Sequence, residues 1–367
     1  MPLYSLTIES GIVPKTKRYE RSFLVKNEEE AYETVQPNDF AYNPMNLRFG
    51  ALARHIEPKA VKVSKYYNIF SVNPKADIVF ADYLLTKSSS IRFYDSIAMG
   101  SLVEKKRVHF SDFLKSEFLL PPIAEQEKIA SFLGAIDTRL TQLRRKHELL
   151  QTYKRGVMQK LFSQQIRFKC DRGKPFPEWE KKKFSQVFER ITRKNKENNL
   201  NTLTISAQHG LINQRDFFNK SVSADDLTGY YLLKRGDFAY NKSYSNGYPM
   251  GATKRLKLYE KGVVSTLYIC FSSENEVEAQ FYEKYFEGGF LNHELSKIAQ
   301  EDARNHGLLN MSVVEFFRDI TLDYPSIKEQ EKIANFLTAI DQKIDAISKQ
   351  IELTERFKKG LLRKMFV

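Results

Sequence analysis

The sequence is poor in the residues that build disulfides and metal sites. Its 367 residues include only two cysteines, Cys170 and Cys270, and none of its six histidines is spaced from another as His-x-x-x-His. Two isolated thiols form no disulfide framework, and these spacings do not match those of zinc ligands. So few cysteines are typical of a reducing compartment, and we expect a cytoplasmic protein.

The sequence also lacks a long apolar run. The longest nearly apolar stretch, residues 263–271, is too short to span a bilayer. The first residues show no basic segment followed by an apolar one, so we expect neither a signal peptide nor a membrane partner. Lys and Arg number 58 against 45 Asp and Glu, which gives a net charge of +13. This surplus favours a nucleic-acid partner, although a generic basic soluble protein fits it equally well.

Catalytic motifs are missing as well. The strings nearest to the Asn/Asp-Pro-Pro-Tyr/Phe motif of amino methyltransferases, at residues 43–45 and 73–75, do not fit it. No Gly-x-x-x-x-Gly-Lys-Ser/Thr loop occurs, which excludes a P-loop motor. Asp171 and residues 180–182 match a nuclease pattern only faintly, and a solvated charge run explains them more simply. We therefore expect no catalytic residues, no metal site and no cofactor in this chain.

An internal repeat organises the sequence. Residues 121–162 recur without a gap at residues 325–366, with 19 identities over 42 aligned positions. Chance agreement would give about two or three. A weaker similarity precedes each copy, since Asp-Phe-Ala-Tyr-Asn at residues 39–43 recurs at residues 237–241. The chain is therefore expected to alternate variable domain, helix, variable domain, helix.

Both copies are predicted to be helices of about 40 residues with a single apolar stripe. Each follows a proline, and apolar positions recur at steps of four and three, which is typical of a heptad seam. The first seam is Ile129, Leu133, Ile136, Leu140, Leu143, His147, Leu150, Lys154, Val157 and Leu161; the second is Ile333, Leu337, Ile340, Ile344, Ile347, Ile351, Thr354, Lys358, Leu361 and Met365. The simplest mate for each helix is the other copy, packed antiparallel within the chain. Pairing with another molecule is the alternative.

The segments between the helices are predicted to be compact α+β domains. Residues 61–72 and 263–271 are rich in β-branched and aromatic residues, and polar loops with glycine intervene. The predicted boundaries are residues 1–120 and 164–324 for the domains and residues 121–163 and 325–367 for the helical spacers. Residues 165–200 have no counterpart in the first domain, which is therefore N-terminally short. Its true start lies upstream, another chain supplies the piece, or the domain is impaired.

Two variable domains that alternate with two nearly identical helices resemble the specificity subunits of type I restriction–modification systems. The resemblance lies in the proline-led Ile-x-Glu-Gln-Glu-Lys-Ile-Ala-x-Phe-Leu-x-x-Ile-Asp motif of both helices, the Asp-Phe-Ala-Tyr-Asn segments, and Lys-Pro-Phe-Pro-Glu-Trp at residues 174–179. It implies two target recognition domains separated by an intramolecular antiparallel coiled coil with pseudo-two-fold symmetry. Each domain would read one half of a bipartite asymmetric site in double-stranded DNA, and the helices would set the spacing.

The resemblance also implies partners. Two methylation subunits, which use S-adenosylmethionine, and restriction subunits, which use ATP and Mg, would assemble around this chain. The chain itself would be the non-catalytic specificity subunit of a methyltransferase and endonuclease complex. A coiled-coil scaffold and a transcription-regulating DNA-binding protein are the alternatives.

Contacts with DNA are expected from loops that follow the Asp-Phe-Ala-Tyr-Asn strands and from segments near the end of each domain. Lys and Arg neutralise phosphates, whereas Arg, Asn and Ser hydrogen-bond to base edges. The candidates are Asn43, Arg48, Arg54, Lys106 and Arg107 in the first domain, and Asn241, Lys242, Ser243, Tyr244, Lys254, Arg255 and Arg304 in the second. Ordinary surface-loop chemistry is the alternative for each of them.

Overall fold

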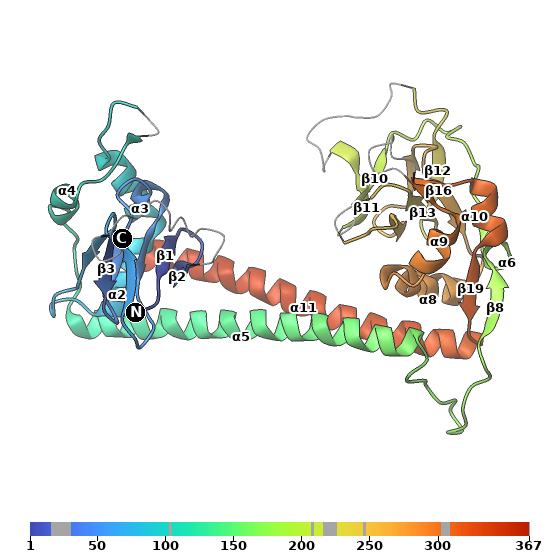
Figure 1. Cartoon of the computed structure of the whole chain (residues 1–367), viewed down its shortest axis with the longest axis horizontal. Helices are drawn as coiled ribbons and strands as arrows, with labels where there is room; N and C mark the ends of the chain where they lie inside the picture. Colours follow the sequence, from blue (N-terminus) through green and yellow to red (C-terminus); the bar gives the residue numbers. More distant parts are fainter. Residues whose placement is uncertain are drawn as a thin grey trace. The chain divides into compact units, whose positions relative to one another are not determined.

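The chain folds into two compact units, each with a globular part and portions of both long helices. The computed structural model describes residues 1–15, 31–102, 105–206, 209–215, 226–244, 247–301 and 309–366 (Figure 1). Unit 1 comprises Met1–Arg145 and Lys349–Val367, and unit 2 comprises Lys146–Ser348. The long helices are α5 (Ile123–Phe162) and α11 (Ile327–Met365). No helix within these described ranges is long and apolar enough to cross a membrane.

The globular part of unit 1 is built on small antiparallel sheets and short helices. Its elements are β1 (Tyr4–Thr7), β2 (Gly11–Pro14), β3 (Tyr32–Val35), β4 (Phe40–Tyr42), η3 (Leu47–Phe49), β5 (Leu52–Arg54), β6 (Val61–Ser64), β7 (Asn68–Phe70), α2 (Ile78–Thr86), α3 (Ser88–Ile97) and α4 (Phe110–Leu114). β1 pairs with β2, β3 pairs with β6, and β4 lies between β5 and β7. The core forms where Phe40 and Tyr42 of β4 are buried among Leu85, Tyr94 and Phe113 of the helices.

Apart from η3, the described part of unit 2 repeats this order of elements and adds more. Its elements are β8 (Glu180–Lys183), α6 (Phe184–Val187), β9 (Glu189–Arg190), β10 (Leu203–Ser206), β11 (Gly210–Asn213), β12 (Tyr231–Lys234), β13 (Phe238–Asn241), β14 (Ala252–Arg255), β15 (Lys261–Val264), β16 (Ile269–Ser272), α8 (Glu276–Glu287), α9 (Asn292–Ile298), β17 (Gln300–Glu301), β18 (Leu309–Asn310), α10 (Val313–Asp319) and β19 (Thr321–Tyr324). Its largest sheet has the order β14-β13-β16-β9, and β19 pairs with β8.

Strand registers show that the two units are copies of one fold. Phe40 on β4 faces Arg54 and Phe70, and the equivalent Phe238 on β13 faces Arg255 and Phe271. The aromatic pairs stack at centroid distances of 5.3 Å in both units. The α+β expectation is therefore confirmed for both globular parts.

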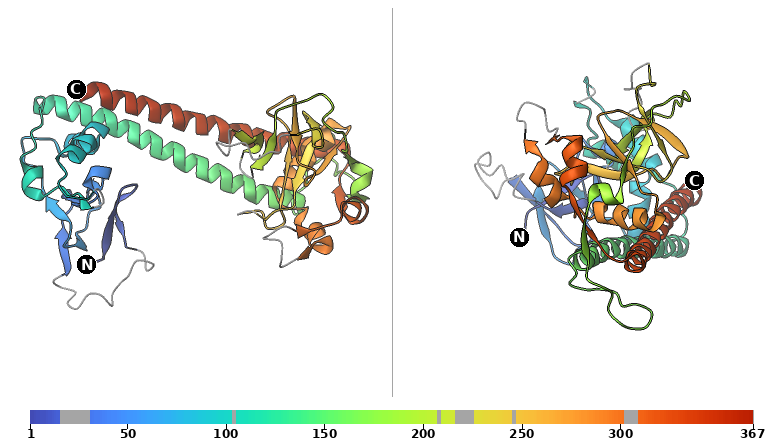
Figure 2. Two further views of the ribbon diagram at one scale, coloured as in Figure 1. Left: turned by 90° about the horizontal axis from the view of Figure 1, so that it is seen from above. Right: turned by 90° about the vertical axis from the view of Figure 1, so that its right-hand side faces the viewer.

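The predicted seams of both long helices face their mates. All twenty seam positions are buried or half-buried. In unit 1, Leu133 and Leu140 of α5 cluster with Leu361 of α11, so the early part of α5 meets the late part of α11. In unit 2, Leu161 of α5 clusters with Ile333, so the late part of α5 meets the early part of α11 (Figure 2). The pairing is antiparallel and within one chain, as predicted.

Equivalent ion pairs fix the register of the helix pair in each unit. Asp137 accepts from Lys358 at 2.6 Å in unit 1, and Asp341 pairs with Lys154 at 2.6 Å in unit 2. Asp341 is the repeat equivalent of Asp137, and Lys358 is that of Lys154. The two lysines that interrupt the apolar seams are thus explained, because each neutralises an acid on the opposite helix.

Candidate nucleic-acid interface

The loops that follow β4 and β13 begin with the same asparagine turn. The Oδ1 atom of Asn43 accepts from the backbone N–H of Met45 at 3.0 Å, and Oδ1 of Asn241 accepts from that of Ser243 at 3.1 Å. An asparagine that binds the backbone two residues ahead shapes a turn. Gly251 ends the second loop with φ +76°, and a Cβ there would lie 2.2 Å from the Asn241 carbonyl oxygen, so only glycine fits. Both asparagines therefore position the candidate side chains beside them.

The structure brings the two predicted groups of unit 1 together. The N–H of Val108 donates to the Pro44 carbonyl at 2.9 Å, which places Lys106 and Arg107 next to the Asn43 turn. Arg107 is exposed and Lys106 is half-buried. These three residues thus form one polar surface patch in unit 1.

Unit 2 repeats this juxtaposition. The N–H of Leu309, the first residue of β18, donates to the Lys242 carbonyl at 3.0 Å, which joins β18 to the loop after β13. Arg304, predicted to bind DNA, lies outside the described residues. In the described part of each unit, a later segment of the domain thus adjoins the loop that the asparagine begins.

In and beside the loop after β13, aromatic side chains lie close to lysines. Tyr244 is 63% exposed, and Lys242 and Ser243 are half-buried beside it. Lys254 lies 3.3 Å from the hydroxyl of Tyr248 and 5.0 Å from its ring centroid. Hydroxyls and ammonium groups of this kind can bind base edges and phosphates.

The arginines predicted to read bases are instead held by acids of their own units. Arg54 pairs with Asp82 at 3.2 Å, and its side chain is 15% exposed. The equivalent Arg255 pairs with Glu276 at 2.6 Å and is 8% exposed. The hydrogen bond from Arg255 is the main cause of a lowered pKa of the Glu276 carboxyl. Arg54 connects the edge strand β5 to α2, and Arg255 connects the edge strand β14 to α8, a structural role that the sequence did not reveal.

Arg48 is also engaged. Its Nε atom lies 3.0 Å from Asp95 on α3, and its guanidinium lies 4.5 Å from the Phe49 ring centroid. A side chain held by both a carboxylate and a ring has little freedom to reorient. DNA contact by Arg48, Arg54 or Arg255 stays a prediction, and their geometry favours roles in stabilising the units.

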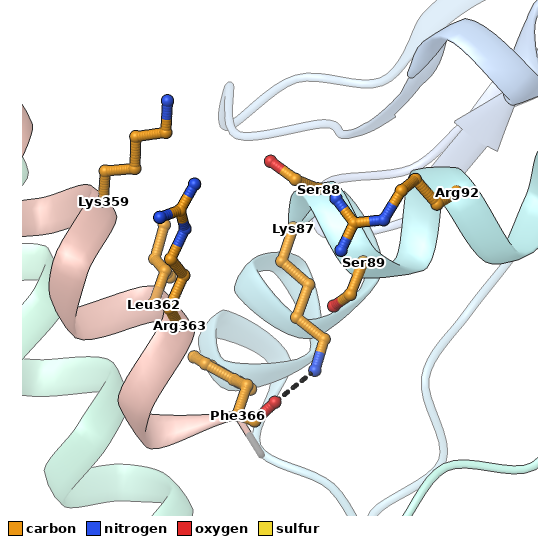
Figure 3. Close-up of a pocket in the computed structure, with 8 residues that line it drawn as sticks. All are labelled: Lys87, Ser88, Ser89, Arg92, Lys359, Leu362, Arg363 and Phe366. Atoms are coloured by element: carbon orange, nitrogen blue, oxygen red, sulfur yellow. Dashed lines mark hydrogen bonds between the residues drawn. The ribbon is translucent and has the colours of Figure 1, made fainter.

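A basic cleft that the sequence analysis missed lies in unit 1 between α3 and the end of α11. Its volume is about 450 Å³, and it is lined by Lys87, Ser88, Ser89, Arg92, Lys359, Leu362, Arg363 and Phe366. The guanidinium groups of Arg92 and Arg363 point into the gap between the helices (Figure 3). Lys87 donates to the Phe366 carbonyl at 2.8 Å, and burial lowers its pKa. Four cations without a lining acid suit the phosphates of a nucleic acid.

Comparisons with known proteins agree with this architecture. No family model matches the chain. The MjaVIII specificity subunit of a type I restriction enzyme from Methanocaldococcus jannaschii is 27% identical over 270 residues, which are 66% of this chain and 59% of that protein. The match thus spans about three fifths of that relative's length.

Solved structures share the fold. The S subunit of a type I restriction–modification system from M. genitalium has a TM-score of 0.56 at 15% identity and covers 100% of this chain and 88% of that one. A chain from a structure on complex assembly and conformational transition of the type I R-M system has a TM-score of 0.50 at 15% identity, covering 92% and 83%. In its duplicated helix motif, its curated relative and its fold, the chain is similar to the specificity subunits of type I restriction–modification systems.

Proposed function

We propose that the chain is the DNA-sequence-recognition subunit of a type I restriction–modification complex. Each globular domain reads one half of a bipartite, asymmetric target in double-stranded DNA. The observation that carries this proposal is that two units of one fold present different side chains beside the same asparagine turn. Beside this asparagine, unit 1 offers Lys106 and Arg107, whereas unit 2 offers Lys242 and Tyr244. Unlike contacts on like scaffolds suit unlike half-sites.

The long helices supply the spacing and the docking sites for two methylation subunits. Identical residues at matching repeat positions are exposed in both helices, among them Glu127 and Glu331. Two copies of one surface can bind two copies of one partner. Restriction subunits join the same assembly.

A repeated glycine supports a docking role for the helices. Gly156 and Gly360 lie within α5 and α11, and a Cβ at either would meet nothing within 4 Å. A glycine inside a helix costs about 0.5–1 kcal/mol relative to alanine, so the fold of the chain alone gives no reason for it. Close approach of a partner's surface to the helix at these two positions would give one.

The chemistry of the complex resides in the partners. The methylation subunits bind S-adenosylmethionine and the restriction subunits bind ATP with Mg, while this chain is non-catalytic. The basic cleft of unit 1 adds contacts with DNA phosphates, which position the duplex without reading its sequence.

The test is to co-express the chain with methylation subunits and map the methylated bases in the host DNA. We expect a two-part motif with a constant spacer, lost when the chain is omitted. Replacing Lys242, Ser243 and Tyr244 together with alanine should alter one half of the motif and leave the other intact. The matched control replaces Lys257, exposed on the same unit and paired with Glu283 at 2.8 Å. Methylation without sequence preference would refute the proposal and favour a scaffold.

A further inference from the structure

One face of unit 1 is exposed where the same face of unit 2 is covered. We call it the unit 1 docking surface; it comprises residues 117–120 and the side chains of Ile123, Glu125 and Phe132. Leu119 is 95% exposed, and Leu120, Ile123 and Phe132 are 43–45% exposed. Apolar side chains exposed together mark a binding surface more often than a free one.

In unit 2 a strand covers the equivalent backbone. β19 pairs antiparallel with β8, from Thr321 opposite Lys183 to Tyr324 opposite Glu180. Residues 117–120 precede Pro121 as β19 precedes Pro325, so they are the equivalents of β19. No strand in the described part of unit 1 pairs with them. Their backbone groups form an edge to which a strand can be added.

The start of the spacer helix shows the same contrast. Glu329 on α11 is fully buried and accepts hydrogen bonds from Trp179 Nε1 and Arg167 Nη2, both at 3.0 Å. Its repeat equivalent Glu125 on α5 is exposed, and its carboxylate makes no hydrogen bond or ion pair within the described residues. A carboxylate presented in this way favours a partner that carries cationic or N–H donors.

The aromatic contact beside this carboxylate is also repeated on one side only. Phe336 on α11 packs edge-to-face on Phe168 at a centroid distance of 5.6 Å. The equivalent Phe132 on α5 has no ring contact within the described residues and is 45% exposed. One segment of unit 2, residues 167–190, thus supplies the ring, the donors and β8.

The same segment also completes the sheet and the core of unit 2. β9 adds a fourth strand beside β16, whereas β7, the equivalent of β16, is an edge strand in unit 1. Phe184 and Phe188 of this segment are buried against Phe271 at centroid distances of 5.0 Å. Figure 1 shows β8, α6 and β19 together at the border of unit 2.

The end of α11 packs on unit 1 in the way that the end of α5, from which residues 163–190 continue, packs on unit 2. In unit 2 the segment follows Phe162, which packs on Phe281 of α8 at 5.4 Å. The repeat equivalent Phe366 packs on Phe80 of α2 in unit 1 at 4.9 Å. A polypeptide joined to the end of α11 would reach the unit 1 docking surface in the same way that residues 163–190 reach β19 and the start of α11 in unit 2.

We propose that the unit 1 docking surface binds a polypeptide segment of the same kind as residues 167–190. The occupant adds a strand to residues 117–120 and donates from Arg and Trp side chains to Glu125. It also packs an aromatic ring on Phe132 and places a short aromatic helix against the core of unit 1. This interaction goes beyond the proposed function and requires no DNA.

The test extends the full chain beyond Val367 with a second copy of residues 163–192 and follows hydrogen exchange at residues 114–132. We expect exchange at residues 117–120 to slow about tenfold or more, and the effect to disappear when the appended copies of Arg167 and Trp179 are alanine. A synthetic peptide of residues 163–192, added in excess to the unextended chain, should give the same protection without any change to its fold.

Variants of the surface itself complete the test. Glu125→Ala should abolish the protection, whereas Glu127→Ala, at an exposed position two residues further along α5, should leave it intact. Unchanged exchange with both extension and peptide overturns the proposal, as does protection that survives in the alanine extension. Protection that instead rises with the concentration of the unextended chain assigns the surface to a second copy and also overturns it. Because no DNA is present, a failure here leaves the recognition role untouched.

Discussion

Removing the carboxylate of Asp341 should strongly destabilise unit 2. Asp341 pairs with Lys154 at 2.6 Å and with Lys284 at 2.5 Å, and these lysine side chains are only 12% and 7% exposed. Breaking a buried pair by removing one partner costs about 3–5 kcal/mol, because the other charge stays buried. Glu287 lies 2.6 Å from Lys154 and offsets part of this, so we expect Asp341→Ala to cost about 3 kcal/mol.

The repeat equivalent provides the comparison. Asp137 pairs with Lys358 and accepts from the Tyr83 hydroxyl at 2.6 Å, but it is 39% exposed. An exposed pair contributes about 0–1 kcal/mol and a hydrogen bond about 1 kcal/mol, so Asp137→Ala should cost about 1–2 kcal/mol. The structure thus predicts unequal losses at two positions that the sequence cannot distinguish.

Urea unfolding of the full chain measures both losses. The single tryptophan, Trp179, lies in unit 2, so its fluorescence follows that unit, while circular dichroism follows both. Asp341→Ala should lower the midpoint seen by fluorescence, and Asp345→Ala, an exposed acid one turn further on, is the control. The reasoning is refuted if Asp341→Ala shifts the fluorescence midpoint no more than Asp345→Ala does.

Four further predictions concern pH, a buried arginine, a helix glycine and the basic cleft. Burial alone would raise the pKa of Asp341, but Lys154 and Lys284 hold this pKa below its ordinary range. The stability that Asp341 contributes should therefore be complete at pH 7 and shrink below about pH 4. A difference in unfolding free energy between wild type and Asp341→Ala that does not change over this pH range would contradict the prediction. Arg255→Ala should lower the unfolding free energy by about 1–2 kcal/mol without DNA present, measured by urea unfolding, because it removes the ion pair with the exposed Glu276 and the hydrogen bond to the Gly236 carbonyl. Gly156→Ala should stabilise the chain by about 0.5–1 kcal/mol yet weaken binding of methylation subunits in pull-down titrations, whereas Gly134→Ala should only stabilise. Arg363→Ala should weaken binding to duplexes of any sequence and reduce the salt slope of log Kd by about one.

The sequence predicts those parts of the fold whose pattern lies within one continuous segment of the chain. The seams of α5 and α11 are visible because every fourth or third residue is apolar, and the matched copies indicate that the mate lies in the same chain. Lys154 and Lys358 interrupt this pattern, yet they belong to it, because each meets an acid that only the antiparallel register brings opposite.

The candidate site was less predictable, since it depends on residues that meet only after folding. Arg255 looks like a base-reading arginine in a loop region, but it ends β14 beside two acids of α8, Glu276 and Glu283, that lie more than twenty residues later in the sequence. The basic cleft joins residues near Lys87 to residues near Arg363 and has no continuous signature. The adjoining turns at Asn43 and Asn241 were found because the preceding strand is repeated almost letter for letter.

Each spacer helix carries both the acid and the lysine that form ion pairs with the other helix. An acid at Asp137 or Asp341 is followed seventeen positions later by Lys154 or Lys358, so an antiparallel neighbour with the same sequence satisfies both charges at once. Either half of the molecule can therefore be replaced by a half of different evolutionary origin, provided that its helix keeps this acid and this base. Such an exchange would change the side chains that one globular part presents and leave the ion pairs between the helices unchanged.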